Sequence, residues 1–174
     1  MKKEETILEV TILLIIYLFL LSFFDLKLIL SNTTTSGGDT PSHHYIAFYL
    51  KNYLLPKFKI YGWSPDWYAG FPILTFYFPL PYLLIVFLSY LLPFTISFKI
   101  VTLLGIFLLP VFILISLKTM KFEFPIPILA SILSLYFLFS ESYTFYGGNI
   151  ASTLAGEFPY SISLSFLVLL VGFL

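Results

Sequence analysis

ILEVTILLIIYLFLLSFFDLKLILS, residues 7–31, is apolar over a length that could cross a membrane as one helix. A span needs about 20 apolar residues, because the hydrocarbon core is about 30 Å thick and a helix rises about 1.5 Å per residue. Lys2 and Lys3 precede this run, which favours a cytoplasmic N-terminus. A cleaved signal peptide is the alternative interpretation. The length of the run and the lack of an A-x-A-like cleavage motif favour an uncleaved anchor.

The whole chain shares this apolar character. Of its 174 residues, 59% are hydrophobic and 10% are charged, whereas soluble domains average about 45–50% apolar and about 25% charged residues. Such a chain cannot cover itself with a water-compatible surface, so we expect a multi-pass protein of the cell membrane, with the lipid bilayer as its partner. Nine basic and nine acidic residues cancel, which gives no reason to expect nucleic acid as a partner. The absence of cysteine excludes disulfides and thiolate chemistry.

We therefore expect an all-α fold, a polytopic transmembrane helical bundle whose extracytoplasmic first loop carries interfacial helices. The expected segments after the first span at 7–31 are an outer loop at 32–70, a Pro-broken span or re-entrant segment at 71–94, spans at 98–117 and 124–140, a loop at 141–158 and the start of a further span at 159–174. Because the last apolar run reaches the final residue without a polar flank, we expect the front part of a longer protein.

The segment 71–94 decides the topology. If it crosses the membrane, the two loops face opposite sides; if it dips in or lies in the interface, both loops share the outer face. Lys118 and Lys121 favour the second arrangement, which puts the short connection that carries them in the cytoplasm. Lysines in the first loop oppose it, although long loops count less in this rule. We expect both loops on the extracytoplasmic side.

A helix is expected within the first loop. Thr40 can cap it and Pro41 suits its first position, and it would end before Pro56. Its apolar residues outnumber the polar ones, which is typical of a helix that lies on the membrane rather than crossing it.

Asp39 is the strongest candidate for a catalytic residue. Gly37 and Gly38 free the backbone before it, and the positive end of the expected helix favours an ionised carboxylate. Such a carboxylate at the membrane surface can act as a general base toward a hydroxyl or amine. It can equally hold a divalent cation through its oxygens, although no other cofactor is expected. The third alternative is that Asp39 only caps the helix or solvates the loop.

The two histidines of the chain, His43 and His44, are adjacent. They would point about 100° apart on a helix, which argues against a two-histidine zinc site, so we expect no metal centre built on them. His43 lies four residues after Asp39 and can approach it. Either histidine could contact a phosphate oxygen or steady Asp39, and the alternative is that neither has a role.

The second loop carries two more candidates. Asn149 follows Gly147 and Gly148, and Glu157 stands immediately before an apolar run. Glu157 could supply a second carboxylate to a shared site, or it could be a first-turn acid that complements the next helix. The glycines lack the strand–glycine–helix context of a nucleotide-binding loop.

Three patterns carry a resemblance to known proteins: GGDTPSHHY, WYAGFPILTFYFPLPYLL and YGGNIASTLAGEFPYSISLS. A first span, an outer loop with an early acid, a membrane-hugging helix and an aromatic, Pro-rich re-entry resemble the front end of the C-type membrane glycosyltransferases (GT-C). More narrowly, the patterns resemble a group of mostly archaeal and bacterial membrane proteins labelled "6-pyruvoyl-tetrahydropterin synthase-related". Soluble pterin synthases hold zinc with three histidines, whereas this chain has two, which argues against pterin chemistry.

The resemblance implies transfer of a sugar from a polyprenyl-phosphate donor to a lipid, glycan or protein acceptor outside the cytoplasm. Asp39 then matches the catalytic base, and His43 or His44 falls where donor-phosphate contacts are expected. We expect Lys51, Lys57 or a histidine to neutralise the leaving phosphate, and Asn149 and Glu157 to lie in a loop that closes over the site. The first loop has no paired acidic motif of the kind found in the enzyme family.

Two other functions stay open on the sequence. One is a non-catalytic multi-span protein, such as a transporter, a lipid-handling protein or an assembly subunit. A transporter would place polar or charged residues at mid-span, and the span centres here carry almost none. The other is a truncated, inactive remnant.

Overall fold

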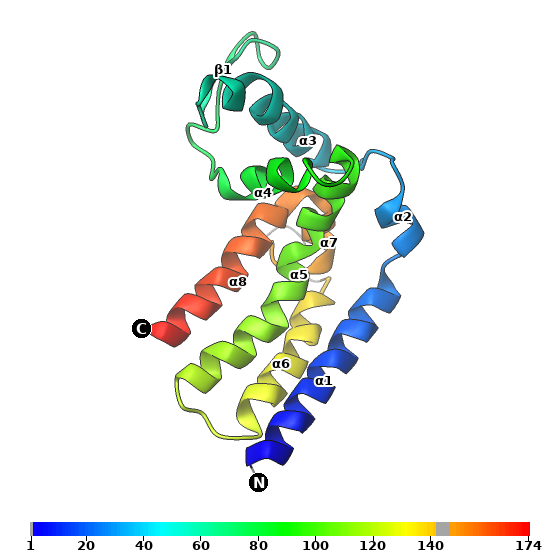
Figure 1. Cartoon of the computed structure of the whole chain (residues 1–174), viewed down its shortest axis with the longest axis vertical. Coiled ribbons are helices and arrows are strands. Elements are labelled where there is room, and N and C mark those ends of the chain that lie inside the picture. Colours follow the sequence, from blue (N-terminus) through cyan, green and yellow to red (C-terminus); the bar gives the residue numbers. More distant parts are fainter. Residues whose placement is uncertain (1, 142–146) are drawn as a thin grey trace.

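The computed structural model describes residues 2–141 and 147–174 and consists almost entirely of helices (Figure 1). Residues 142–146, in the expected loop at 141–158, lie outside the described residues. Helices α1 (Lys2–Phe23), α5 (Phe94–Thr119), α6 (Ile126–Leu138) and α8 (Phe158–Phe173) run side by side as a bundle. Two three-residue strands are the exception to the helical fold. The expectation of an all-α helical membrane protein is confirmed.

Three helical stretches in the described part of the chain are long and apolar enough to cross a membrane: Lys3–Phe23, Phe94–Thr119 and Ile150–Phe173. Half of the apolar window of α5 is buried, compared with 17% for α1, so α5 is the central helix and α1 lies at the edge. Close packing of α5 on α8 depends on Gly105, because a Cβ there would lie 2.5 Å from the backbone of Ser161. Small residues commonly allow such close approach between membrane helices.

The first helix ends earlier than expected. The predicted span at 7–31 is split, because α1 stops at Phe23 and a separate short helix, α2 (Leu26–Leu30), follows it. Asp25 is the cause: its side chain accepts hydrogen bonds from the backbone N–H groups of Lys27, at 2.9 Å, and Leu28. An aspartate in this position starts a new helix, so the chain turns here.

Two other expected membrane segments are short. The segment 71–94 contains only one helix, α4 (Leu80–Leu88), whose nine residues would extend about 14 Å. Helix α6 replaces the expected span at 124–140, and its 13 residues would extend about 20 Å, less than the roughly 30 Å of a bilayer core. Pro125 and Pro127 set its start, because proline suits only the first turn of a helix. The amide of Asn149 donates to the carbonyl of Ser140 just beyond its other end, at 2.7 Å.

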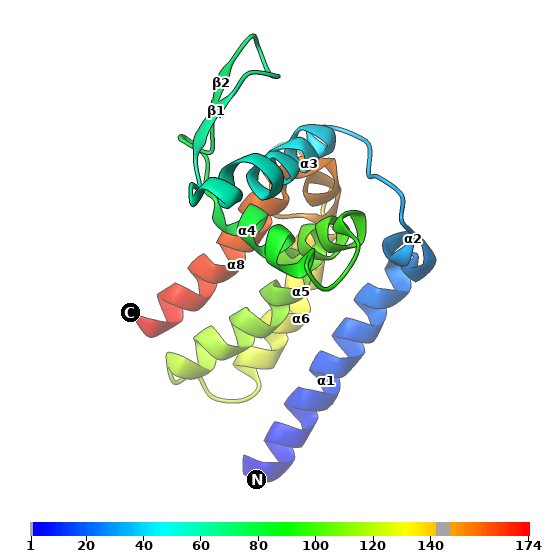
Figure 2. The ribbon, with the colours of Figure 1, turned by 45° about the horizontal axis from the view of Figure 1, so that its top comes forward.

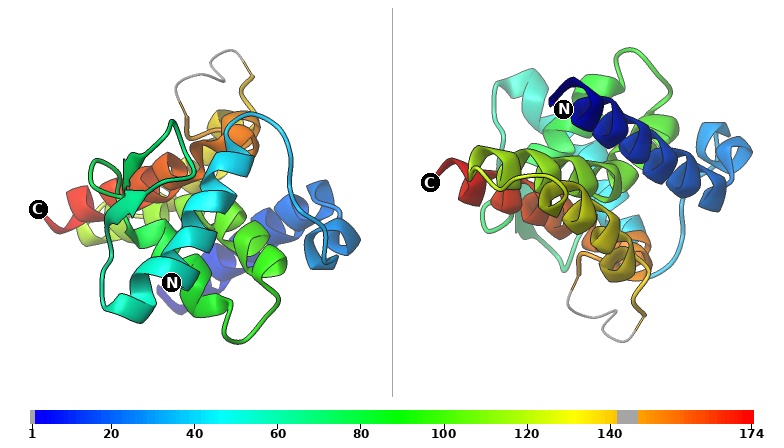
Figure 3. Two further views of the ribbon diagram at one scale, coloured as in Figure 1. Left: turned by 90° about the horizontal axis from the view of Figure 1, so that it is seen from above. Right: turned by 90° about the horizontal axis from the view of Figure 1, so that it is seen from below.

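A cap covers one end of the bundle. Helix α3 (Thr40–Tyr49), continued by the π-helical turn η1 (Leu50–Leu54) and the 3-10 turn η2 (Leu55–Lys57), lies across the ends of the bundle helices (Figure 3). The predicted helix begins at Thr40 as expected, but its α-helical part ends at Tyr49 and the turns that continue it pass Pro56 and end at Lys57. Strands β1 (Gly62–Ser64) and β2 (Phe71–Ile73) pair in an antiparallel hairpin that projects beyond α3 (Figure 2). The Tyr49 hydroxyl donates to the carbonyl of Trp63 at 2.8 Å and joins the two.

The second loop meets the first at this cap. After Asn149 the chain forms α7 (Ile150–Ser152) and a second π-helical turn, η4 (Thr153–Glu157), before α8. The backbone N–H of Asp39 donates to the carbonyl of Ala155 at 2.7 Å. The described parts of both loops therefore lie at the same end of the bundle, as the shared-face arrangement requires.

Candidate functional site

The position of Asp39 is fixed by its backbone and not by its side chain. Asp39 precedes α3 at the N-cap position, yet its carboxylate makes no capping hydrogen bond. Its N–H group is held by Ala155, and Gly156 packs so closely that a Cβ there would lie 3.0 Å from the Asp39 Cβ. Among the interpretations of Asp39, that of a simple helix cap is therefore not supported by the geometry. The exposed carboxylate is free to meet a ligand.

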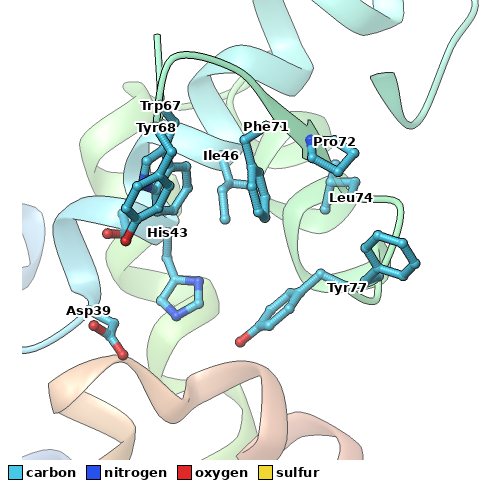
Figure 4. A pocket seen from close by; sticks show the side chains of 11 residues that line it. Asp39, His43, Ile46, Trp67, Tyr68, Phe71, Pro72, Leu74 and Tyr77 are labelled. Carbon is cyan, nitrogen blue, oxygen red and sulfur yellow. The ribbon is translucent and has the colours of Figure 1, made fainter. Parts of the chain in front are cut away.

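A cavity of about 310 Å³ opens beside this carboxylate. Figure 4 shows Asp39, His43 and Tyr77 directed toward the same space, with aromatic side chains of the hairpin on the opposite wall. The lining side chains come from α3, the hairpin and the turn after it, and they are Asp39, Ser42, His43, Ile46, Trp67, Tyr68, Phe71, Pro72, Leu74, Phe76 and Tyr77. The cavity thus combines one carboxylate with a mainly aromatic wall.

His43 is held firmly within this wall. Its Nδ1 lies 2.6 Å from the hydroxyl of Tyr82, and its ring meets the ring of Phe158 edge-on at 5.3 Å. Burial lowers the pKa of His43 below its usual range, and the nearby charge of Asp39 opposes this effect only in part. His43 is therefore neutral at neutral pH. It can accept or donate one hydrogen bond but does not supply a positive charge.

Two tyrosines of the site feel the negative charge of nearby carboxylates. Burial raises the pKa of Tyr77, and the negative charges of Glu157 and Asp39 raise it further. Burial also raises the pKa of Tyr82, with smaller contributions from Tyr77 and Glu157. Both hydroxyls therefore stay protonated and can donate. Glu157 is half-buried before α8 and does not line the cavity, and its negative charge reaches both tyrosines.

The other predicted site residues lie elsewhere. His44 packs against Phe94 and Phe98, and its Nε2 is buried with no hydrogen-bond partner in the described part of the chain. Lys51 donates to the carbonyl of Ser89 and lies 5.3 Å from the ring centroid of Tyr90.

Asn149 is also outside the cavity. Its side-chain oxygen accepts from the N–H of Ser152 at 2.8 Å and so caps α7. The structure thus brings together Asp39, His43 and Glu157, but not His44, Lys51 or Asn149.

Sequence reasoning missed the aromatic members of this site. No role in the site was expected for Trp67, and Tyr77 and Tyr82 lie in the segment 71–94, which was expected to be a Pro-broken span or a re-entrant segment. The only signal in the sequence was the density of tyrosine and tryptophan between the first loop and α4. Their convergence on Asp39 depends on the hairpin, which the sequence pattern did not reveal.

The site does not suit the zinc of soluble pterin synthases. No group of three or more histidine, cysteine or acidic side chains that could hold a metal ion occurs within the described residues. His43 faces Tyr82 and Phe158, whereas His44 faces Phe94 and Phe98, so the two rings cannot bind one ion. In the described part of the cavity wall, only Asp39 offers a carboxylate to a cation.

Chemically, this arrangement can accept a proton at Asp39 and donate hydrogen bonds from Tyr77. Aromatic side chains offer a flat apolar surface with a polar edge, which suits ligands that carry both characters.

Comparison with known proteins identifies the family. A search of curated proteins and a search of solved structures found no match. A family model described as "6-pyruvoyl-tetrahydropterin synthase related domain; membrane protein" matches residues 74–174, more than half of the chain. The match includes Tyr77, Tyr82 and Glu157 but begins after Asp39 and His43. With its family and its several apolar helices, the protein is a multi-pass membrane protein. The chain belongs to the membrane protein family of the 6-pyruvoyl-tetrahydropterin synthase related domain.

Proposed function

We propose that the protein is a membrane glycosyltransferase of the GT-C kind. It transfers a sugar from a polyprenyl-phosphate-linked donor to a lipid, glycan or protein acceptor on the extracytoplasmic face. The observation that carries the proposal is the carboxylate of Asp39, which is fixed through its backbone, makes no capping hydrogen bond and borders an aromatic cavity at the capped end of the bundle.

In the proposed reaction, Asp39 acts as the general base. Its carboxylate takes the proton from the acceptor hydroxyl as the acceptor oxygen bonds to the anomeric carbon of the sugar. The bond between that carbon and the phosphate oxygen breaks, and the polyprenyl phosphate leaves with the electron pair. Tyr77, whose pKa is raised by burial and by two nearby carboxylates, stays protonated and donates a hydrogen bond to the leaving phosphate.

Other residues hold the reactants. The sugar would lie against the aromatic wall formed by Trp67, Phe71 and their neighbours, because a sugar ring has one apolar face. His43, fixed by Tyr82, shapes the floor of the cavity beside Asp39. Glu157 does not line the cavity, and its negative charge adds to the effect of burial, which raises the pKa of Tyr77 and Tyr82. Lys51 takes no part here, because its amine lies among Ser89, Tyr90 and Phe94.

The test is a turnover assay on membranes that contain the full-length protein and a polyprenyl-phosphate sugar. Asp39→Asn should lower turnover by about 10²- to 10⁴-fold, the usual contribution of a general base. Asp66→Asn is the matched control, because Asp66 is an exposed acid in the same loop whose side chain accepts from Tyr45 and does not line the cavity. Unchanged turnover in Asp39→Asn would remove Asp39 from the role of base.

Adding the chelator EDTA to the assay distinguishes a general base from a carboxylate that holds a divalent cation. If Asp39 acts as a base, turnover continues in EDTA. If Asp39 instead holds a divalent cation, EDTA stops turnover and added Mg²⁺ or Mn²⁺ restores it.

A non-catalytic lipid-handling protein is the second candidate. The observation that favours it is the buried amine of Lys99 in α5, which borders a separate cavity. On this alternative, wild-type membranes bind the lipid-linked sugar without consuming it.

A further inference from the structure

A second cavity, of about 370 Å³, lies on the other side of the segment that leads to Asp39. Its wall comes from the junction of α1 with α2, from residues 33–36, from α5 and from η4. Ser36 lines this cavity and Asp39 lines the first one, so only Gly37 and Gly38 separate the two along the chain. Nothing in the proposed glycosyl transfer uses this second cavity.

Lys99 is the unusual feature of this wall. Its side chain is almost fully buried in the first turns of α5, and its Nζ donates to the carbonyls of Leu28, at 2.7 Å, and Ser31, at 2.9 Å. The same amine lies 3.0 Å from the hydroxyl of Thr33 and 3.2 Å from that of Ser31, so each of its three N–H groups has an acceptor within the protein. None of these partners carries a charge, and no acid within the described ranges lies at ion-pair distance from Lys99. Buried charges are usually paired, so the site lacks a negative partner.

The polar part of the wall fits an anion. Hydroxyl-bearing side chains surround the cavity at Thr33, Thr34, Thr35, Ser36 and Thr102. The Thr35 hydroxyl oxygen is buried and has no hydrogen-bond partner in the part of the chain that the structure describes. A buried hydroxyl without a partner is costly, so a ligand oxygen at this point would relieve that cost. Asp25 borders the cavity too, with one carboxylate oxygen on the N–H groups of Lys27 and Leu28.

The rest of the wall is apolar. Phe24, Leu28, Ile29, Leu103 and Leu154 line it, and they lie where α1 ends and α5 begins. An inorganic anion gains nothing from contact with an apolar surface, whereas the hydrocarbon chain of an amphiphile is stabilised when it is buried against one.

We propose that this cavity binds a phosphate-bearing lipid, with the phosphate on Lys99 and the threonine hydroxyls and the first part of the chain on the apolar wall. The buried amine supplies the opposite charge although protein atoms accept its N–H groups, and the hydroxyls, that of Thr35 among them, donate to the phosphate oxygens. The proposal does not depend on glycosyl transfer, because none of its residues takes part in that reaction.

The test is native mass spectrometry of the whole protein in an uncharged detergent. The probe is farnesyl phosphate, with farnesol as the uncharged analogue and inorganic phosphate as the free anion. We expect farnesyl phosphate to bind at least about tenfold more tightly than either of the others, because only it meets both parts of the wall. Equal binding of farnesol would overturn the phosphate site, and equal binding of inorganic phosphate would overturn the lipid.

Variants locate the site. Lys99→Gln should weaken farnesyl phosphate binding by at least about tenfold, because it removes the positive charge beside the phosphate. Lys51→Gln is the matched control, since it removes the same charge from a partly buried lysine outside the cavity.

Because Lys99 also joins α2 to α5, Lys99→Gln could fail to fold, and Thr35→Val covers that case. Thr35→Val removes a hydroxyl without a protein partner, so the fold should be kept while binding weakens by about three- to tenfold. Wild-type binding in Thr35→Val, or equal loss in Lys51→Gln, would refute the site.

Discussion

The substitution Gly38→Ala tests whether the crossing of the two loops positions Asp39. Gly38 has φ = +49°, a left-handed conformation that L-residues adopt with difficulty. A Cβ at this position would lie 2.0 Å from the carbonyl oxygen of Ala155. That oxygen accepts the hydrogen bond of the Asp39 N–H. The new methyl group must therefore push the start of α3 away from η4.

The expected cost combines two contributions. A left-handed alanine costs about 1–2 kcal/mol, and loss of the Asp39–Ala155 hydrogen bond costs about 1 kcal/mol. The crossing should thus be destabilised by about 2–3 kcal/mol. Since every 1.4 kcal/mol or so is a factor of ten, the amide of Asp39 should exchange its hydrogen about 30- to 150-fold faster than in the wild type.

Hydrogen exchange measured by mass spectrometry on peptides from α3 and η4 reads this change directly. Gly37→Ala is the control, because Gly37 also has a positive φ, of +110°, but a Cβ there meets nothing within 4 Å. It carries backbone strain without the collision. We expect exchange on both sides of the crossing to be faster in Gly38→Ala than in Gly37→Ala, together with a larger loss of turnover that depends on Asp39. Equal exchange in the two variants would refute the claim that contact with Ala155 holds Asp39 in place.

Three further predictions concern the surroundings of the site and the bundle. Tyr82→Phe removes the hydroxyl that contacts the His43 ring and should lower the unfolding free energy by about 1–2 kcal/mol, read by thermal denaturation. Burial lowers the pKa of His43 and His44 below the usual 6.5, so near that pH the unfolded chain binds more protons than the folded one. The stabilising contribution of the two neutral histidines should be complete above pH 6.5 and fall as the pH drops below it. The loss of stability in acid should be smaller in a His43→Gln variant. Lys118→Met should destabilise the bundle by about 3 kcal/mol, because it leaves the buried carboxylate of Glu9 without an opposite charge. Glu9→Gln should cost less than about 1 kcal/mol, because the side chain of Lys118 is half-exposed and water can solvate its amine. Equal losses of stability in thermal denaturation would contradict this difference.

The membrane class and the first-loop helix could be predicted from the sequence for simple physical reasons. Apolar runs of span length have few other uses, and the pair Thr40-Pro41 is a strong start signal for a helix. The carboxylate of Asp39 was found by the same reasoning, since two glycines and a helix start flank it.

The lengths of the membrane helices could not be predicted as well. Hydropathy does not report where a helix ends, and it gives no sign that Asp25, inside an apolar run, caps a separate helix. The contact between Tyr82 and His43 could not be predicted from the sequence either, because the two residues are 39 positions apart and no periodicity relates them. Lys51 and Asn149 were assigned to the site by their place in polar loops, whereas local packing and capping use their side chains.

The candidate site joins two parts of the chain that meet only in the folded protein. Asp39 and His43 come before the segment that matches the family, and Tyr77, Tyr82 and Glu157 lie within it. The hydrogen bonds from Asp39 to Ala155 and between His43 and Tyr82 tie the two parts together, and neither part encloses the cavity alone. A member of the family could therefore keep the frame of helices while offering no carboxylate at the position of Asp39. Membership thus supports the fold, and the proposed chemistry depends on the one acid that the first loop brings to the cavity.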